Sequence, residues 1–485
     1  MSEQKRKPTL IEAFIPVVFL ILLIFTNVMI FEDPLAGSNQ IALILSALVA
    51  GLIAWFSGTR WLQIEKGIVS SIKAAMPSIL ILLLIGSLAG TWLISGIVPA
   101  MIYYGLQILN PTIFLLAACV VCAIVSVATG SSWSTVATIG IALLGIGKAL
   151  GLSDGMVAGA IISGAYFGDK MSPLSDTTNL APAMAGTDIF THIRYMLYTT
   201  VPSIIITLVL FLIIGLTGTS EVEIDKIQNV LLNIDNAFFI SPVLFIVPVV
   251  VIVMIVRKIP AIPALLTGTL LGGLFAIIFQ PHVIYDVSKV SDNFFHASYI
   301  TVMKAIYSTV NIPSENAIVN ELLTTSGMAG MLNTIWLILS AMTFGGTMEA
   351  GGLLQRITEE VIKLAKSTGS LIFSTAGTCI FFNITASDQY LAIIVPGRMF
   401  ADTYRERGLK PENLSRTLED AGTVTSVLIP WNTCGATQSS VLQVPTMTYL
   451  PFCFFNLISP LMTIIFGIFR IKIARIPSQD KSKIA

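Results

Sequence analysis

Residues 168–179 read GDKMSPLSDTTN and directly follow the apolar run GMVAGAIISGAYF at 155–167. The stretch combines the carboxylates of Asp169 and Asp176, the ammonium of Lys170, and several hydroxyl and amide side chains. Such oxygen ligands suit a small hard cation, and Na⁺ fits them better than a transition metal does. A carboxylate in a low-dielectric cavity can also carry a proton at ordinary pH. The stretch therefore predicts a group that binds either Na⁺ or H⁺.

Three further polar breaks interrupt apolar sequence, at 129–132, 383–388 and 430–435. Pro173 and Pro430 each remove a backbone donor and bend or stop a helix. We expect the ion to be bound by side chains of all four breaks. The candidates for Na⁺ and H⁺ binding are Asp169, Asp176, Thr177, Thr178, Asn179, Ser175, Asp388, Asn383, Thr385, Asn432 and Thr433, with Na⁺ itself at Asp169, Asp176 and Asn432. The supporting residues are Ser131, Ser132, Lys170, Pro173, Pro430, Glu349 and Asp420.

Each of the main candidates also has a structural explanation. Asp169 and Lys170 could form an ion pair at a helix end. Asp176 could cap a helix that starts at Thr177, because Asp is a favoured N-cap residue. Glu349 could face water, and Asp420 could equally line the site or lie on the surface.

The composition places these breaks inside a membrane protein. Hydrophobic residues make up 55% of the 485 residues and charged residues 11%, whereas a soluble domain carries about 25% charged residues. The small residues of 155–165 suit close helix packing. Long apolar stretches are near the roughly 20 residues that cross a bilayer. They lie at 11–31, 40–57, 75–95, 112–128, 195–217, 238–256, 261–279, 331–348 and 445–469. We expect an all-α polytopic fold whose first helix is retained.

The chain repeats its order of features. Sliding the sequence along itself until Gly151 meets Gly408 also places Pro173 on Pro430, and it aligns the polar breaks of the two halves. We therefore predict two repeats, 1–217 and 238–470, joined by an external linker at 218–237. An extra external segment at about 280–330 and a cytoplasmic tail at 471–485 complete this division.

Basic residues predict opposite orientations for the two repeats. Of 27 Lys and Arg, 21 lie in the N-terminal tail, 60–73, 257–258, 356–366, 398–416 and the tail from Arg470. Positive loops stay cytoplasmic, and the first-half counterparts of 257–258 and 356–366 contain no Lys or Arg. Inverted repeats with helices broken near the membrane midplane are typical of secondary transporters. We expect both termini in the cytoplasm of a multi-pass cell-membrane protein.

Other chemistry has little support. Cys119 and Cys122 form a CxxC without a nearby His or third Cys, which favours core packing over metal or redox use. Gly147-Lys148 lacks the first glycine and the Ser/Thr of a phosphate loop. The three histidines have no metal spacing. We expect no enzyme activity, no cofactor and no nucleic-acid partner.

The segment GAYFGDKMSPLSDTTNLAP (164–182) resembles the signature region of NhaC-type Na⁺/H⁺ antiporters, and the second-half NTCGA extends this likeness over most of the chain. The resemblance implies a transport domain moving against a scaffold, with Asp169, Asp176, Thr177 and Asn179 in the matching motif. The family also includes malate/lactate exchangers.

We therefore predict Na⁺/H⁺ antiport by alternating access. The alternative is exchange of a small carboxylate, malate or lactate, coupled to Na⁺ or H⁺. Lys170 is the only base in the first-half motif, adjacent to Asp169, which we expect to neutralise it. A channel is disfavoured, because paired inverted breaks suit alternating access better. A homodimer is a further expectation.

Overall fold

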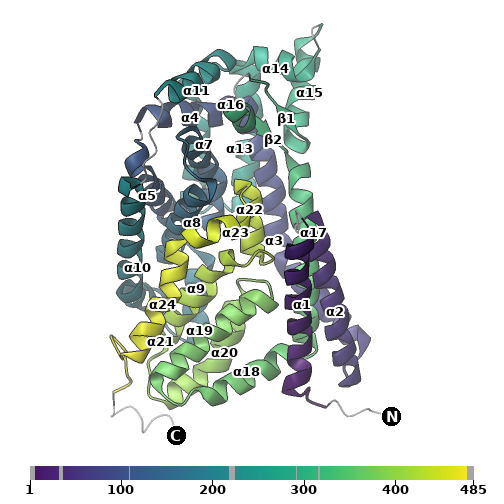
Figure 1. Cartoon of the computed structure of the whole chain (residues 1–485), viewed down its shortest axis with the longest axis vertical. Helices are drawn as coiled ribbons and strands as arrows, with labels where there is room; N and C mark the ends of the chain where they lie inside the picture. The colour runs from purple at the N-terminus through teal and green to yellow at the C-terminus, as the bar shows by residue number, and fades with distance from the viewer. Residues whose placement is uncertain are drawn as a thin grey trace.

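The protein is described by a computed structural model that covers residues 6–31, 36–108, 110–217, 224–290, 292–314 and 317–477. It is a tall bundle of helices in which the start and the end of the described chain lie at the same, lower end (Figure 1). Two short strands, β1 (Val310–Asn311) and β2 (Thr324–Thr325), form an antiparallel pair. The expectation of an all-helical polytopic membrane protein is confirmed.

Eight helical segments in the described part of the chain are long and apolar enough to span a membrane. They are Leu10–Asn27, Ser38–Phe56, Trp61–Ile94, Pro111–Thr129, Ser132–Ala149, Ile189–Thr217, Ala261–Phe279 and Met328–Ala350. Two bent pairs are further candidates, Ile227–Ala237 with Pro242–Val256, bent by 85°, and Thr446–Phe452 with Phe454–Ile468, bent by 58°. The span Ser132–Ala149 was not among the predicted apolar stretches.

The first half of the described chain contains eleven elements. These are α1 (Leu10–Ile30), α2 (Ser38–Phe56), α3 (Trp61–Ile94), α4 (Ile97–Ile108), α5 (Pro111–Thr129), α6 (Ser132–Thr135), the π-helix η2 (Val136–Gly140), α7 (Ile141–Ala149), α8 (Asp154–Met171), α9 (Asp176–Ala185) and α10 (Ile189–Thr217).

The remaining helices begin within the predicted linker 218–237, which contains the first of them and of which 218–223 lie outside the described residues, as do 478–485 of the predicted tail. They are α11 (Ile224–Ala237), η3 (Pro242–Phe245), α12 (Ile246–Val256), α13 (Ala261–Phe279), α14 (Pro281–Ser288), α15 (Phe294–Tyr307), α16 (Ala317–Leu322), η4 (Met328–Met331), α17 (Leu332–Ala350), α18 (Leu353–Leu364), α19 (Thr368–Thr385), α20 (Leu391–Glu406), α21 (Pro411–Leu418), the π-helix η5 (Glu419–Thr423), η6 (Ser426–Leu428), α22 (Thr433–Leu442), α23 (Thr446–Tyr449), η7 (Leu450–Phe452) and α24 (Phe454–Ile468).

Several helices recur at the offset that places Gly151 on Gly408. Helices α5, α8 and α9 start at 111, 154 and 176, and this offset carries their starts onto those of α19, α21 and α22, at 368, 411 and 433. Helix α4 starts at Ile97 and α18 at Leu353, which is one position short of the same offset. The order of elements around the polar breaks is therefore the same in both halves.

Left-handed backbone positions follow the same offset. A positive φ is unusual for residues other than glycine, and eight of the described residues that have one form four pairs related by this offset to within one position. The pairs are Gly96 (77°) with Gly352 (73°), Gly130 (71°) with Ser387 (59°), Gly151 (74°) with Gly408 (67°), and Gly186 (84°) with Gln443 (54°).

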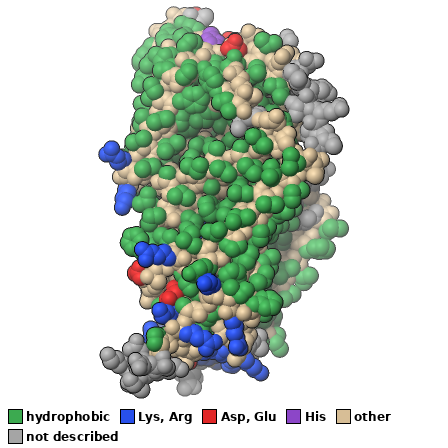
Figure 2. Space-filling view, turned by 90° about the vertical axis from the view of Figure 1, so that its left-hand side faces the viewer, with side chains coloured by type: hydrophobic (Ala, Val, Ile, Leu, Met, Phe, Trp, Pro, Cys, Tyr) green, Lys and Arg blue, Asp and Glu red, His purple; other side chains and the backbone are tan. Residues whose placement is uncertain are grey.

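Small residues allow α8 to lie directly against α5. A Cβ atom on Gly164 would come within 2.0 Å of the carbonyl oxygen of Cys119, so this contact needs glycine. All five cysteines are free and buried, as expected for core residues. The outer wall is largely apolar, and Lys and Arg side chains gather mainly toward the lower end in Figure 2.

Candidate functional site

The two polar breaks of the first half lie against each other. Gly130 ends α5 in the left-handed region, and a Cβ atom there would meet the Leu174 Cβ at 2.6 Å and the Ser175 N at 2.9 Å. The hydroxyl of Ser172 donates to the carbonyl of Val127 at 2.8 Å. The two breaks are therefore in direct contact.

Asp169 is the residue that joins the two breaks chemically. It lies in the last turn of α8, is 7% exposed, and lines a cavity of about 810 Å³. Its Oδ2 atom accepts a hydrogen bond from the Ser132 hydroxyl at 2.7 Å and another from the Ser132 backbone N–H at 3.1 Å. A helix N-terminus favours negative charge, and Ser132 is the first residue of α6.

Most hydroxyl and amide groups of 172–179 bind the interrupted backbone. The Thr178 hydroxyl donates to the carbonyls of Asp169 and Lys170, at 3.2 and 3.0 Å. Asn179 donates to the carbonyls of Pro173 and Ser175, at 3.0 and 2.7 Å. This explains much of the polarity of the stretch, because carbonyls freed at a helix break need donors.

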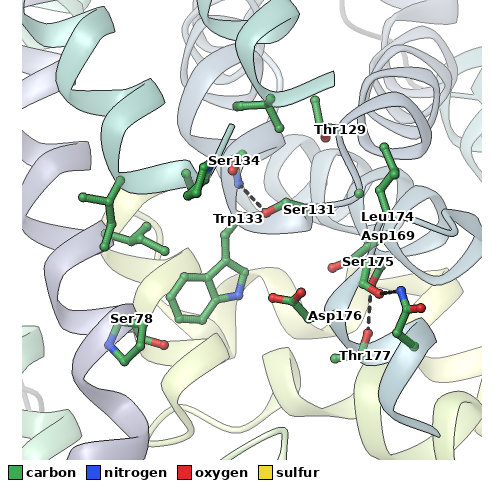
Figure 3. Close-up of a pocket in the computed structure, with 18 of the residues that line it drawn as sticks. Ser78, Thr129, Ser131, Trp133, Ser134, Asp169, Leu174, Ser175, Asp176 and Thr177 are labelled. Atoms are coloured by element: carbon green, nitrogen blue, oxygen red, sulfur yellow. Dashed lines mark hydrogen bonds between the residues drawn. The ribbon is translucent and has the colours of Figure 1, made fainter. Parts of the chain in front are cut away.

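Ser175, and not Asp176, caps the second helix. Its hydroxyl accepts the N–H of Thr178 at 3.4 Å, while Asp176 is already the first residue of α9. The structural explanation of Asp176 as the N-cap is therefore wrong. Asp176 is exposed and lines the cavity, and Figure 3 shows its carboxylate directed toward the Trp133 indole. Its charge is thus presented to the cavity.

The cavity is built mainly from the first half of the chain. Its oxygen-bearing side chains come from Ser78, Thr129, Ser131, Ser134, Asp169, Ser175, Asp176, Thr177, Asn179, Gln389, Tyr390 and Thr433. Lys258, Ile259 and Pro260, in the exposed loop between α12 and α13, line it as well. Residues from both halves thus surround one space, and its polar surface is rich in oxygen.

Lys170 pairs with a residue far away in the sequence. Its Nζ atom forms an ion pair with Asp420 of η5, and both side chains are completely buried. The expectation that Asp169 neutralises Lys170, and the alternative of an Asp169–Lys170 ion pair, are therefore wrong. Asp420, left open between lining the site and lying on the surface, is instead a buried ion-pair partner behind the cavity.

Glu419 is a buried acid that was not among the predicted site residues. It is 0% exposed, and its Oε1 atom accepts the Thr177 hydroxyl at 3.1 Å. Its signal in the sequence was a Glu-Asp pair in an apolar stretch, within a segment that forms a π-helix. Such π-helical turns are frequent at functional sites.

The two asparagines of the second-half breaks bind each other. The Asn432 amide donates to the side-chain and backbone oxygens of Asn383, both at 3.1 Å. Its Oδ1 atom accepts the Cys434 N–H at 3.0 Å, so Asn432 caps α22. Asn383 in turn donates to the Gly422 carbonyl at 2.7 Å. Both residues are buried, and neither belongs to the described lining of the cavity.

The other second-half candidates are more dispersed. Asp388 accepts the Leu391 N–H at 2.9 Å at the start of α20, and Thr385 donates to the Phe381 carbonyl within α19. Thr433 lines the cavity, whereas Pro430 lies in the break before α22. Glu349, near the end of α17, is exposed, as its structural explanation expects. The structure therefore brings the first-half acids and Thr433 together, but not Asp388 or Glu349.

The ligand chemistry of the cavity is that of hard oxygen atoms. Within the described ranges, no group of three or more His, Cys, Asp and Glu side chains is placed to hold a metal ion. Carboxylate, hydroxyl and amide oxygens are the donors that the described side chains offer to this cavity, and such oxygen ligands suit hard cations.

Comparison with known proteins gives a consistent picture. Residues 164–471 match the sequence model of the Na⁺/H⁺ antiporter family. The chain is 38% identical to the Na⁺/H⁺ antiporter NhaC of Alkalihalophilus pseudofirmus, over 88% of this chain and 89% of that protein. It is 37% identical to the NhaC of Bacillus subtilis, over 88% and 92%. It is also 36% identical to the malate-2H⁺/Na⁺-lactate antiporter of Bacillus subtilis, over 95% of both chains.

Proposed function

The chain belongs to the Na⁺/H⁺ antiporter family, and from this premise we propose that it exchanges Na⁺ for H⁺ by alternating access, with Asp169 binding the two ions in turn. The predicted resemblance to NhaC-type antiporters and the prediction of a transporter rather than an enzyme are confirmed by these relatives. The chain is a multi-pass membrane protein.

The position of Asp169 is the observation that carries the proposal. It is the buried carboxylate that both lines the cavity and is held by the N-terminal turn of α6. With Na⁺ bound, the carboxylate would balance the charge of the ion, and neighbouring hydroxyls would replace its water oxygens. With a proton bound, the same group would be neutral. One site cannot hold both ions, and this exclusion is the minimal chemistry of an antiporter.

Asp176 has a different part in this proposal. It is exposed within the cavity and has no hydrogen-bond partner among the described residues. A carboxylate in such a place raises the local concentration of cations without having to hold them, because clefts of one charge sign focus the electrostatic field. We therefore assign Asp176 to attraction of the ion and Asp169 to its exchange.

Alternating access is supported by the repeated backbone. Equivalent helices begin at one nearly constant offset along the chain, and four pairs of left-handed residues follow the same offset. We interpret the two halves as inverted repeats, because the distribution of basic residues favours opposite orientations. Both ends of the described chain lie at the end where Figure 2 shows most Lys and Arg. This favours cytoplasmic termini.

The cavity favours an inward-open state. Lys258 lines it from the loop between α12 and α13, and the basic pair 257–258 favours a cytoplasmic position for that loop. Ions would then reach Asp169 from the cytoplasmic side in this conformation.

Exchange of malate or lactate is the second candidate. A relative that exchanges them covers 95% of this chain, and a cavity of about 810 Å³ has room for more than an ion. The charges of the cavity favour a cation as the substrate, because its described lining contains two carboxylates, Asp169 and Asp176, and one ammonium, that of Lys258. A dicarboxylate favours cationic partners.

Proteoliposomes with an internal pH dye separate the two candidates. We expect added NaCl to move protons in the absence of any organic acid, and Asp169→Asn protein to serve as the inactive control. Proton movement that requires malate or lactate would instead establish organic-acid exchange.

A further inference from the structure

The ion pair between Lys170 of α8 and Asp420 of η5 lies behind the cavity, and a third helix, α24, also contacts it. The Ser459 hydroxyl on α24 accepts a hydrogen bond from Lys170 Nζ at 3.0 Å and donates to Asp420 Oδ1 at 3.2 Å. The ring of Phe455 lies 5.6 Å from the same Nζ atom. The Lys170 ammonium is therefore fixed toward the second half of the chain.

Asp169 and Lys170 are consecutive residues whose side chains serve different partners. Asp169 binds Ser132 in the first half, and Lys170 binds Asp420 and Ser459 in the second. Successive residues of an α-helix point about 100° apart, since a turn takes 3.6 residues. The lysine stem is long and flexible, so this separation depends on the partner that holds the ammonium.

We propose that Asp420 is a positioning residue that keeps the Lys170 ammonium away from Asp169 and so leaves that carboxylate available to the transported cation. The proposal rests on the role of Asp169 in the proposed function. A buried ammonium without a partner is strongly unfavourable. Without Asp420, Lys170 would turn to a neighbouring carboxylate, and pairing with Asp169 would supply internally the positive charge that Na⁺ otherwise brings.

Glu419, next to Asp420 in η5, is a further buried acid near Lys170. It receives a hydrogen bond from Thr177, and its Oε2 atom has no hydrogen-bond partner in the described part of the chain. In Asp420→Asn protein, Glu419 is therefore a second carboxylate with which the Lys170 ammonium can pair, in competition with Asp169. Adding Glu419→Gln to an Asp420→Asn protein removes this outlet and is expected to increase the loss.

The test measures the Na⁺ concentration for half-maximal proton movement in proteoliposomes. Asp420→Asn is expected to raise it at least about ten-fold, as expected for losing access to one charge-assisted contact. The double variant Lys170→Gln/Asp420→Asn contains no charge at the pair, so nothing competes for Asp169. Its Na⁺ concentration for half-maximal proton movement is expected to lie within about three-fold of the wild-type value, because the contact between Na⁺ and Asp169 is largely restored. Ser459→Ala is the matched control, because it removes a neutral contact and keeps both charges.

The double variant decides the question even if Asp420→Asn does not fold. A double variant that needs about ten-fold more Na⁺ than wild type would overturn the proposal, as would an Asp420→Asn protein with normal Na⁺ dependence. An ion pair that only stabilises the fold would change the amount of folded protein, which monodispersity reports, and would leave the Na⁺ concentration for half-maximal proton movement of the folded protein unchanged in Asp420→Asn. A wild-type protein without any Na⁺-driven proton movement would instead refute the proposed function itself.

Discussion

The Oδ2 atom of Asp169 accepts two hydrogen bonds from one residue, Ser132, whose hydroxyl lies at 2.7 Å and whose backbone N–H lies at 3.1 Å. The two residues belong to different helices, α8 and α6, which both end or begin at a polar break. The carboxylate is thus held in a fixed orientation while it lines the cavity.

Asp169→Asn is expected to abolish Na⁺-driven proton movement, with a loss of at least about 100-fold, the upper range for a buried charge-assisted contact. Asparagine retains an oxygen atom but cannot exchange a proton and does not balance the charge of Na⁺. Ser132→Ala keeps the carboxylate and removes one donor, so it should retain turnover and need more Na⁺. The measurement is dye-reported proton flux, with protein monodispersity as the folding control. A full-rate Asp169→Asn protein would remove this residue from the mechanism.

Asp176→Asn is expected to have a milder effect than Asp169→Asn. Because Asp176 is exposed in the cavity, its loss should raise the Na⁺ requirement about three- to ten-fold and leave the maximal rate nearly unchanged. Added choline chloride should shrink this difference, since salt screens exposed charges. Complete loss of exchange, independent of ionic strength, would show that Asp176 holds the ion directly.

Gly130→Ala is expected to destabilise the protein and slow transport. The left-handed backbone costs alanine about 1–2 kcal/mol, and its Cβ would lie 2.6 Å from the Leu174 Cβ. Gly186→Ala is the control, because Gly186 has φ 84° and nothing lies within 4 Å of an added Cβ. Thermal unfolding in detergent should show a larger loss for Gly130→Ala. Equal losses would mean that contact between the two breaks contributes nothing.

Single-cysteine labelling tests the membrane orientation. All five native cysteines are buried, so they should give little background with an impermeant maleimide. A cysteine at the exposed Asp235 should label from outside, and one at the exposed Glu406 only from inside. Labelling of position 406 in intact cells would end the inverted-repeat interpretation.

The breaks could be predicted from the sequence because their signals are local. Gly130 and Pro173 restrict or release the backbone at their own positions, whatever the rest of the chain does. The alternative explanation of Asp176 as an N-cap was one position off, since Ser and Asp both cap well and Ser175 directly precedes Asp176.

The partners of the buried charges could not be predicted. Lys170 and Asp420 are 250 residues apart, and only the packing of α8 against the second half brings them together. The span Ser132–Ala149 was missed for a related reason. Its hydroxyls and glycines lower its hydropathy. They are tolerated because 78% of the segment is buried within the protein and does not face lipid.

The paired left-handed residues have a consequence for how such duplications should be traced. Gly130 corresponds to Ser387, and Gly186 corresponds to Gln443, so a left-handed φ recurs at positions where the amino acid differs. The proposed relation between the two halves is therefore easier to trace in a string of φ values than in an alignment of residues. At such a pair, the glycine of one half is a reasonable substitution in the other, for example Ser387→Gly.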